Sequence, residues 1–471
     1  MNAERVPLCM DLDGTLTPAN LAHERALGAI KGSRPMLSWL WRRGASGGGG
    51  LAAASGRADV DAGTLPYRPE VLQWLHDQRA AGRRLVLVAD GDAQLGERVA
   101  GHLGLFDEVA RTDGDGSPAE RKRRALVGRF GEHGFDYGGS NASDMPVWEA
   151  SRGALVIGDR SLSDRVGRAT RVLHVFAAPK PTLMTWIKAI RLHQWVKNAL
   201  IFLPALLAHR ITEPAVMLHA TLAFLAFGCC ASSVYVTNDL FDLAADRRHP
   251  SKRRRPFAAG SLSVRDGIKA SVILLLCAAL LAALIGWLYA LVLGGYYVIT
   301  WAYSLRLKRI ALVDVMTLAG LYTMRIIAGA AATYIELSFW LLAFSVFLFL
   351  SLGFVKRYSE VYDARKEGKS VGSARGYGAE DLALVMSLGT ASGYCAVVVI
   401  ALYINSGDSI AMYHHHKPLW LICPLMLFWI SRAWMLTSRG QMHDDPVVFA
   451  LRDRVSLLIL GALGLIVFLS I

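Results

Sequence analysis

The sequence predicts two parts of different fold class, an α/β domain over residues 1–178 and an all-α polytopic membrane domain over residues 195–471, joined by a linker and interfacial segment, 179–194. Up to residue 178 the chain is polar, Gly-rich and broken by turn signals. After Pro179, apolar runs of about twenty residues recur, and this is the length needed to cross a bilayer. With 53% hydrophobic residues and a net charge of +13, the 471-residue chain is too apolar for a soluble globule and too charged to lie wholly within a membrane.

The α/β domain opens on an apolar strand that leads into paired aspartates. In "VPLCMDLDGTLT", Asp11 and Asp13 stand two apart at the strand end, followed by Gly14 and Thr15. Two carboxylates placed in this way can divide the roles of nucleophile and general acid/base. A second apolar strand, "RRLVLVADGD", follows, and further along the chain come Lys122 in "ERKRRALVGRFG" and Asp144 in "FDYGGSNASDMPVW".

These segments resemble the motifs of the haloacid dehalogenase phosphatases, which implies a Rossmann-like sheet. The resemblance implies that Asp11 forms an aspartyl-phosphate with Mg²⁺ present, that Asp13 handles protons and that Lys122 screens nucleophile and substrate phosphate. Asp11, Asp13 and Asp144 are the implied metal ligands.

The N-terminal domain departs from that family's pattern at two positions. Ala89 stands where the family carries Thr or Ser, and Ser140 replaces the first acid of its Gly-Asp-x-x-x-Asp segment. Asp159 and Asp164 in "VIGDRSLSDR" are a weaker match for the missing acid. Two interpretations of the domain therefore stay open. The domain either removes a phosphate from a product or related substrate of the membrane domain, or is a decayed phosphatase kept for binding or structure.

The second part contains nine candidate membrane spans. Alternate loops between them differ in Lys and Arg content: "DRRHPSKRRRP", "SLRLKR" and "KRYSEVYDARKEGK" are rich in both, whereas the intervening loops are nearly free of them. The positive-inside rule therefore predicts a multi-pass protein of the inner (plasma) membrane, with its N-terminal domain cytoplasmic and its C-terminus on the outer side. The N-terminus has no basic region leading into an apolar stretch, so no secretory signal is expected. The spans are 195–208, 214–236, 267–285, 287–303, 311–333, 337–355, 382–404, 418–436 and 453–471.

A group of aspartates follows the 214–236 span. In a continued helix, Asn238, Asp242 and Asp246 stack on one face with Asp239 beside them. Such carboxylates repel one another unless a cation lies between them, and clustered oxygen ligands suit Mg²⁺, which completes its shell with water and substrate phosphates. The alternative is a solvated helix end whose charges pair with the arginines that follow. The cations have an alternative interpretation of their own, as a positive-inside signal and a contact with anionic lipid.

At these residues the chain resembles the UbiA superfamily of intramembrane prenyltransferases, nine-helix proteins in which Mg²⁺ bound to such aspartates holds a diphosphate substrate. Over residues 181–471 one branch matches in particular, the polyprenyl-phosphate (decaprenyl-phosphate) phosphoribosyltransferases. The segments that carry this resemblance are "RLHQWVKN", "NDLFDLAADRRHPSKRRRPFAAG", "YSLRLKRIALVD", "FVKRYSE" and "DDPVVFALRDR".

The branch implies that phosphoribosyl diphosphate, bound through Mg²⁺, loses diphosphate from C1 of the ribose while a polyprenyl phosphate oxygen attacks. Asn238, Asp239, Asp242 and Asp246 would hold the metal, and Asp314 would make a second contact to metal or ribose. Several phosphate groups require several cations, and Arg suits bidentate phosphate contacts. The residues expected to bind substrate are Lys197, Asn198, Lys252, Arg253, Arg255, Tyr303, Lys308 and Lys356.

Two other functions stay open. An aromatic prenyltransferase would use a polyprenyl diphosphate, but those relatives show a second Asp-x-x-x-Asp, whereas Asp314 is followed at the fourth step by Leu318. An ion-coupled transporter would use the aspartates for its coupling ion, yet no duplicated motif is visible. The expected partners are the lipid substrate, the sugar donor and membrane lipids. Nucleic acid is not expected, because the cations cluster at membrane edges, and a homo-oligomer is left open.

Overall fold

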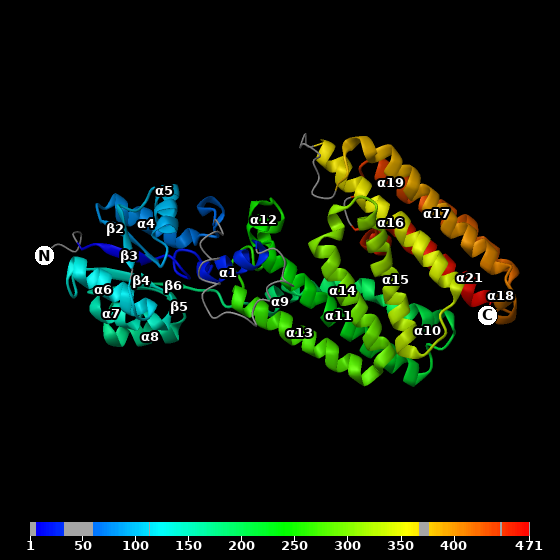
Figure 1. Cartoon of the computed structure of the whole chain (residues 1–471), viewed down its shortest axis with the longest axis horizontal. Coiled ribbons are helices and arrows are strands. Elements are labelled where there is room, and N and C mark those ends of the chain that lie inside the picture. Colours follow the sequence, from blue (N-terminus) through cyan, green and yellow to red (C-terminus); the bar gives the residue numbers. More distant parts are fainter. Residues whose placement is uncertain (1–5, 33–59, 113, 367–375, 443–444, 471) are drawn as a thin grey trace, which may run out of the picture. The chain divides into compact units, whose positions relative to one another are not determined.

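The computed structural model describes residues 6–32, 60–112, 114–366, 376–442 and 445–470 (Figure 1). The chain divides into two compact units. Unit 1 comprises Met1–Leu192 with Tyr235–Val272, and unit 2 comprises His193–Val234 with Ile273–Ile471. The segment that carries the aspartates therefore belongs to the same unit as the N-terminal domain.

The core of the N-terminal domain is a six-stranded parallel sheet with the strand order β3-β2-β1-β4-β5-β6. This is the order of a doubly wound, Rossmann-like sheet. The central strand β1 pairs with β2 and with β4, so its end at Asp11 lies where the strand order reverses, the usual ligand position in such sheets. The α/β prediction is thus confirmed. The strands are β1 (Leu8–Asp11), β2 (Leu85–Asp90), β3 (Glu108–Thr112), β4 (Asp136–Gly139), β5 (Gly153–Gly158) and β6 (Arg171–Ala177).

Helices cover both faces of this sheet, which explains why β1 and most of β2 and β5 are buried apolar runs. Local signals set the helix ends. Ser117 and Glu120 form a capping box at the start of α6, and Gly104, in the left-handed conformation, ends α5. The helices are α1 (Leu21–Gly32), α4 (Pro69–Ala80), α5 (Ala93–Leu103), α6 (Pro118–Phe130), α7 (Met145–Ala150) and α8 (Arg160–Ala169), and the short α9 (Leu183–Ala189) follows the sheet.

The remainder of the chain is helical and apolar, and the protein is a multi-pass membrane protein. Among the residues described, seven helices are long and apolar enough to span a bilayer, or eight if the bent pair α20 (Pro446–Arg452) and α21 (Arg454–Ser470) is counted as one broken span. The seven are α11 (Pro214–Phe241), α13 (Val264–Ile285), α14 (Trp287–Leu305), α15 (Val313–Thr333), α16 (Phe339–Lys366), α17 (Leu382–Ile404) and α19 (Ile422–Ser438).

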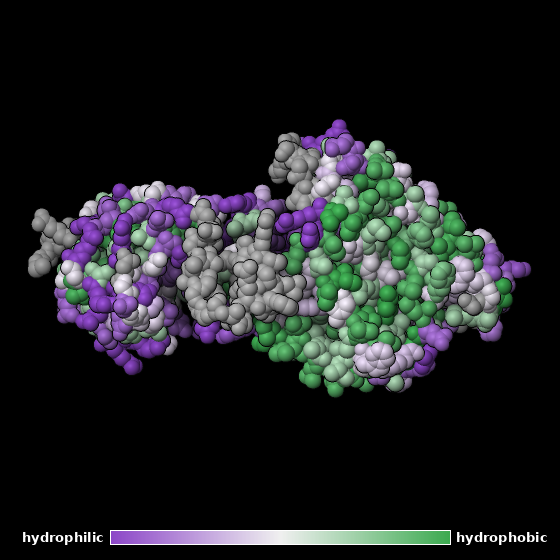
Figure 2. All heavy atoms as spheres, in the orientation of Figure 1, coloured by the Kyte–Doolittle hydropathy of each residue, from purple (hydrophilic) through white to green (hydrophobic). Residues whose placement is uncertain are grey.

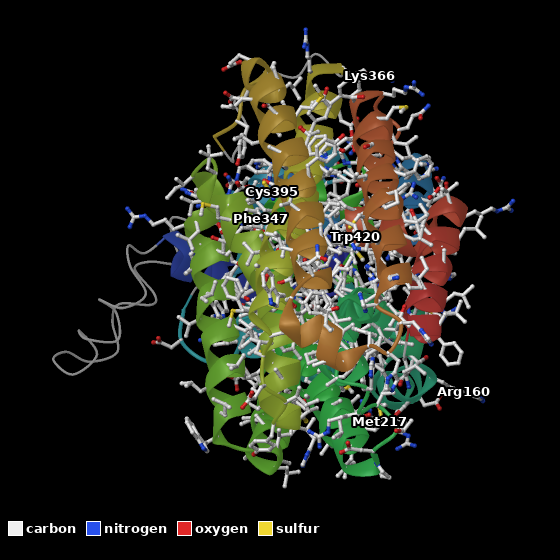
Figure 3. All side chains as sticks on the ribbon, turned by 90° about the vertical axis from the view of Figure 1, so that its right-hand side faces the viewer. Arg160, Met217, Phe347, Lys366, Cys395 and Trp420 are labelled. Atoms are coloured by element: carbon white, nitrogen blue, oxygen red, sulfur yellow. The ribbon has the colours of Figure 1, made fainter. Side chains whose placement is uncertain are left out.

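On the face that Figure 2 shows, the outer surface of these helices is largely apolar. Leu276 on α13 and Val298 on α14 are 64% and 65% exposed. Phe347 and Trp420 also lie at least partly exposed on this unit (Figure 3). Large apolar side chains left uncovered by protein are expected where the surrounding solvent is lipid.

The first predicted span, 195–208, is not an α-helix. It consists of a 3₁₀ helix over Leu192–Phe202, followed by the five-residue helix α10 (Leu203–Leu207). Pro204 lies in the first turn of α10 and has no amide hydrogen to donate, so it begins a new helix and does not continue the preceding one. Nine α-helical spans are therefore not confirmed in the described part of the chain.

Candidate functional site

The aspartate motif lies at a break between two helices. α11 ends at Phe241, Asp242 leaves the helical conformation, and α12 (Leu243–Arg248) begins after it. The predicted continuous helix is therefore wrong at this point. The amide of Asp242 still donates to the Asn238 carbonyl (3.0 Å) and that of Asp246 to the Asp242 carbonyl (2.8 Å), so the helical repeat continues across the break.

Arginine side chains pair with the two most buried carboxylates of the motif. Asp239 and Asp246 are 3% and 4% exposed. The Nη1 atom of Arg255 donates to Oδ1 of Asp239 (3.0 Å) and to Oδ2 of Asp246 (2.7 Å). Arg191 also pairs with Asp239, and its guanidinium lies over the ring of Tyr235, 5.2 Å from the centroid. One guanidinium thus bridges two carboxylates seven positions apart in the chain.

The donor chemistry of this cluster fits Mg²⁺. In the described ranges, which omit residues such as 33–59 and 367–375, no three His, Cys, Asp or Glu side chains are grouped closely enough to hold a metal by themselves. Protein-bound Mg²⁺, however, commonly uses one or two carboxylates and completes its shell with water and substrate phosphates. Asp239 and Asp246, which already share one cation, supply this smaller set.

Some of the cations after the motif are exposed, and others pair with carboxylates. Lys252 and Arg253 are exposed in a short 3₁₀ helix, whereas Arg255 turns to the aspartates. Arg247, which precedes this run, donates from its two terminal nitrogens to the two Glu24 oxygens of α1, at 2.8 and 2.7 Å. These two side chains are only 6% and 9% exposed.

Further contacts connect the aspartate loop to the N-terminal domain within unit 1. Gly260 has a φ of +71°, and a Cβ built there would lie 2.5 Å from Pro18 and 3.3 Å from Pro66, so this position requires glycine. Leu27 of α1 packs against an apolar cluster that includes Leu240. The loop that presents Asp246 and Arg255 is therefore packed against the segment that follows strand β1.

A second charged cluster lies in unit 2 around Asp445. The Nζ atoms of Lys197 and Lys356 lie 2.7 and 3.4 Å from its Oδ2 atom. The Tyr322 hydroxyl donates to Oδ1 (3.3 Å), and so does the Val447 amide (3.2 Å). The two predicted phosphate-binding lysines are thus brought together, and the anion between them, Asp445, was not among the predicted site residues.

Three other predicted residues of unit 2, Asp314, Tyr303 and Asn198, lie in two networks. Asp314 is fully buried, where it pairs with Arg357 and accepts a hydrogen bond from the Tyr377 hydroxyl (2.7 Å). Arg357 also donates to the hydroxyl of Tyr303 (3.2 Å). Lys308 is half-buried in the 3₁₀ helix Leu307–Arg309. A separate contact joins the buried Asn198, through its Oδ1 atom, to Nε of Arg325 (3.0 Å).

The N-terminal domain brings together its predicted site residues at the carboxyl end of the sheet. Lys122, 5% exposed, places its Nζ atom 2.9 Å from Oδ1 of Asp11 and 3.3 Å from Oδ1 of Asp144. Oδ2 of Asp144 is buried without a hydrogen-bond partner, which suits a cation ligand. Burial raises the pKa of Asp13 to about 6, and burial likewise raises the pKa of the Asp11 carboxyl against the opposing effect of Lys122.

The two departures from the phosphatase pattern have visible structural partners. Ala89 packs against α5 at Gly96: a Cβ built on Gly96 would lie 2.7 Å from the Cβ of Ala89. The hydroxyl of Ser140 accepts a hydrogen bond from Thr15 (3.1 Å) in the turn after Asp13. Asp159 caps α8 and pairs with Lys180 (3.2 Å), which leaves Asp144 as the acidic residue beside Lys122.

The sequence analysis did not choose five charged residues that make the contacts described above. They are Arg191, Glu24, Arg325, Arg357 and Asp445. Arg191 and Asp445 both stand inside segments noted for their resemblance, "RLHQWVKN" and "DDPVVFALRDR". Their partners are 48 and 248 positions away along the chain. No local spacing rule connects residues over such separations.

The comparisons with known proteins place this helical architecture in a family. A model described as the UbiA prenyltransferase family matches residues 199–459. The chain belongs to the UbiA prenyltransferase family. Its members are transferases, and this chain is a transferase too, so the transporter interpretation is not retained.

Relatives of the chain differ in how much of it they share. A Sinorhizobium fredii protein called y4nM is 36% identical over 469 residues, covering 98% of this chain and 90% of that protein. The decaprenyl-phosphate phosphoribosyltransferase of Mycobacterium tuberculosis is 34% identical over 281 residues, covering 57% of this chain and 88% of that enzyme. A solved structure of a UbiA homologue from Archaeoglobus fulgidus bound to GPP and Mg²⁺ matches with 19% identity and a TM-score of 0.46, over 60% of this chain and 99% of that one.

Proposed function

We propose that this transferase moves a 5-phosphoribosyl group from phosphoribosyl diphosphate to a polyprenyl phosphate. The observation that carries the proposal is the 34% identity over 281 residues to the Mycobacterium tuberculosis decaprenyl-phosphate phosphoribosyltransferase. An oxygen of the lipid phosphate would form a bond to C1 of the ribose as the bond from C1 to diphosphate breaks. The products would be a lipid-linked phosphoribose and diphosphate.

The cluster around Asp239 is proposed to hold the diphosphate. Mg²⁺, bound by Asp239 and Asp246 with Asn238 and Asp242 nearby, would neutralise the leaving group. Arg255 is proposed to contact the same diphosphate, because a guanidinium matches phosphate oxygens bidentately. Positive charge placed in advance at the leaving group lowers the barrier to its departure.

The remaining predicted residues are assigned narrower parts. Lys197 and Lys356 are proposed to bind a substrate phosphate. Asp314 is proposed to act through Arg357, since its carboxylate is buried against that guanidinium. Contact with substrate phosphates is also proposed for Asn198, Lys252, Arg253, Tyr303 and Lys308.

The proposed topology has nine membrane segments, with the N-terminal domain in the cytoplasm and the C-terminus outside the inner membrane. The bent pair α20 and α21 would be the last segment. The first would be Leu192–Phe202 with α10, since 3₁₀ and α-helices rise about 2.0 and 1.5 Å per residue. If Leu192–Phe202 and α10 lay end to end, together they would be roughly 30 Å long, which is close to the thickness of a bilayer core.

Aromatic prenylation is the second candidate function. The name of the matching family favours it, since it describes prenyl transfer. The substrate would then be a polyprenyl diphosphate and the acceptor an aromatic ring. The absence of a second Asp-x-x-x-Asp after Asp314 is the sequence feature that disfavours it.

We further propose that the N-terminal domain is a haloacid dehalogenase-type phosphoryl-transfer domain. The contact of Lys122 with Asp11 and Asp144 supports this, because it places a cation beside the proposed nucleophile, where it would also screen a bound phosphate. Asp11 would attack the phosphorus atom while Asp13 gives a proton to the leaving alkoxide. Mg²⁺, with Asp11, Asp13 and Asp144 as ligands, would neutralise the phosphate.

The test of the membrane reaction uses the full chain in lipid vesicles with polyprenyl phosphate, Mg²⁺ and radiolabelled phosphoribosyl diphosphate. Label is expected to enter the lipid phase. Asp239→Asn should lower the initial rate roughly a hundredfold, the usual effect of removing one contact to the developing charge. Asp266→Asn is the matched control, because that carboxylate bonds only to neighbouring Ser263 among the contacts described. Intact donor with no transfer, followed by prenylation of an aromatic acceptor, would select the second candidate.

A further inference from the structure

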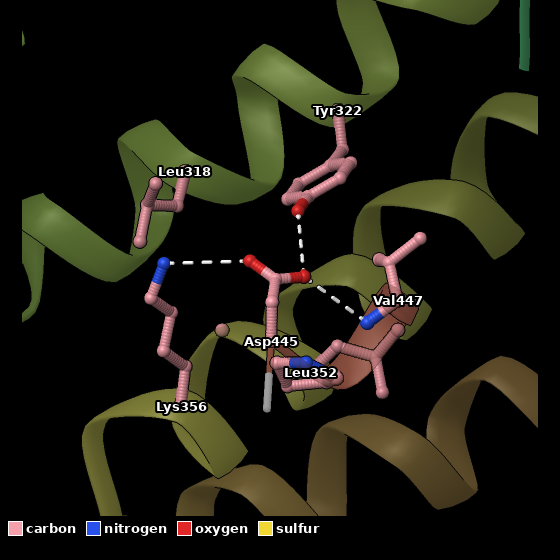
Figure 4. A pocket seen from close by; sticks show the side chains of 8 residues that line it. Leu318, Tyr322, Leu352, Lys356, Asp445 and Val447 are labelled. Atoms are coloured by element: carbon pink, nitrogen blue, oxygen red, sulfur yellow. Dashed lines mark hydrogen bonds and ion pairs between the residues drawn. The ribbon is translucent and has the colours of Figure 1, made fainter. Parts of the chain in front are cut away.

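The carboxylate of Asp445 has hydrogen-bond donors at both of its oxygens. Two ammonium groups, one hydroxyl and one backbone amide surround it, at 2.7–3.4 Å. Figure 4 shows the Lys356 ammonium, the Tyr322 hydroxyl and the Val447 backbone amide facing its two oxygens from different elements. Phosphate oxygens accept hydrogen bonds from the same kinds of donor.

The cluster places two ammonium groups on one carboxylate. The side chains of Lys197 and Asp445 are only 9% and 15% exposed, so these charges lie in a poorly hydrated place. Asp445 keeps both ammonium groups paired there, which matters because an unpaired buried charge is costly. A phosphate group carries negative charge and more acceptor oxygens than a carboxylate, so it could take over the same donors.

The cavity described beside Asp445 is too small for a phosphate group. Its volume is about 20 Å³, which is room for about one water molecule. Tyr322 and Lys356 line it together with Asp445. A phosphate that reached these two side chains through this cavity would therefore take the place of the carboxylate.

We propose that Lys197, Lys356 and Tyr322 form a phosphate-binding site whose place Asp445 holds until a phosphate group of the substrate displaces it. The proposal deepens the proposed function, since its ligand is a phosphate group of either the donor or the lipid acceptor. Asp445 is in this sense an internal competitor, and it keeps two buried ammonium groups paired when no substrate is bound.

The test measures pyrophosphate binding to the purified full chain by titration calorimetry in EDTA, so that neither metal nor turnover contributes. Asp445→Asn keeps the shape of the side chain and removes its charge. The dissociation constant is expected to fall at least tenfold, because the competing charged hydrogen bonds are lost. Asp453→Asn is the matched control: that carboxylate also has donors at both oxygens, from Arg432 and Ser456, and is 17% exposed. It should leave the dissociation constant unchanged.

Weaker or unchanged pyrophosphate binding in Asp445→Asn would overturn the proposal, since the carboxylate would then favour anion binding or have no effect on it. A titration with geranyl phosphate identifies the source of the ligand. If Asp445→Asn binds only this monoester more tightly than the wild type, the site takes the lipid phosphate. If it binds only pyrophosphate more tightly, the site takes the donor.

A second measurement uses the wild-type chain, so it does not depend on the variant folding. Hydrogen exchange at the Val447 amide should accelerate when pyrophosphate or geranyl phosphate binds, because its acceptor moves away. Unchanged exchange with either ligand bound would refute displacement. A positive titration without sugar transfer would instead reject the proposed reaction and leave this site standing.

Discussion

The ion pair between Glu24 and Arg247 gives a sharp test of how the aspartate loop is held. Glu24→Gln removes one charge and leaves the Arg247 guanidinium, 6% exposed, without its carboxylate. Breaking one side of a buried ion pair costs about 3–5 kcal/mol. The lower value applies here, because Arg247 keeps its hydrogen bond to the Ala258 carbonyl at 3.1 Å. About 3 kcal/mol corresponds to roughly a hundredfold in the opening equilibrium of the loop.

Hydrogen exchange followed by mass spectrometry measures this opening directly. Amides in residues 243–262 should exchange roughly a hundredfold faster in Glu24→Gln than in the wild type. Glu213→Gln is the control, since the Arg210–Glu213 pair has two hydrogen bonds of 2.7 Å but is 43% and 46% exposed. Exposed pairs contribute little, so this variant should exchange like the wild type. Equal exchange rates for Glu24→Gln and the wild type would refute the idea that this pair holds the loop.

Two further predictions concern the N-terminal site. Because burial raises the pKa of Asp13 to about 6 and the general acid must be protonated, hydrolysis of an alkyl phosphate such as glycerol phosphate should decline as the pH rises through about 6, and a profile flat across that range would contradict the assigned role. Lys122→Met leaves two buried carboxylates without their shared cation and should lower the same hydrolysis rate roughly a hundredfold, whereas Lys180→Met, at an exposed pair with Asp159, should not change it.

The sequence was most informative where structure depends on a local pattern. Apolar runs identified seven spanning helices, since a helix that satisfies its own backbone hydrogen bonds is what the bilayer permits. The strand before Asp11 was recognisable because a buried parallel strand is a continuous apolar run. Two local errors have different origins. Pro204 was a visible break that the hydropathy of 195–208 outweighed, whereas no Gly or Pro marks the end of α11 at Phe241.

The charged partners were less accessible, because they are set by tertiary packing. Arg255 follows its aspartates closely and was among the candidates, and the structure pairs it with Asp239 and Asp246. Arg191 and Asp445 were not, although each contacts a residue that was chosen. A lysine or arginine in a membrane-edge loop looks the same in the sequence whether it binds a substrate, a lipid or a carboxylate. The ion pair between Arg247 and Glu24 became visible only in the folded structure.

The packing of α1 against the aspartate loop has a consequence for how this chain can be divided. A recombinant N-terminal piece ending at residue 178 would expose Leu27 and leave Glu24 without Arg247. The corresponding membrane piece would lose the support of Pro18 and Pro66 at Gly260. A transferase that lacks such an N-terminal part must therefore stabilise its loop by other means. In this chain the fusion is part of how the aspartate motif is built, and the two parts are best produced and studied in one polypeptide.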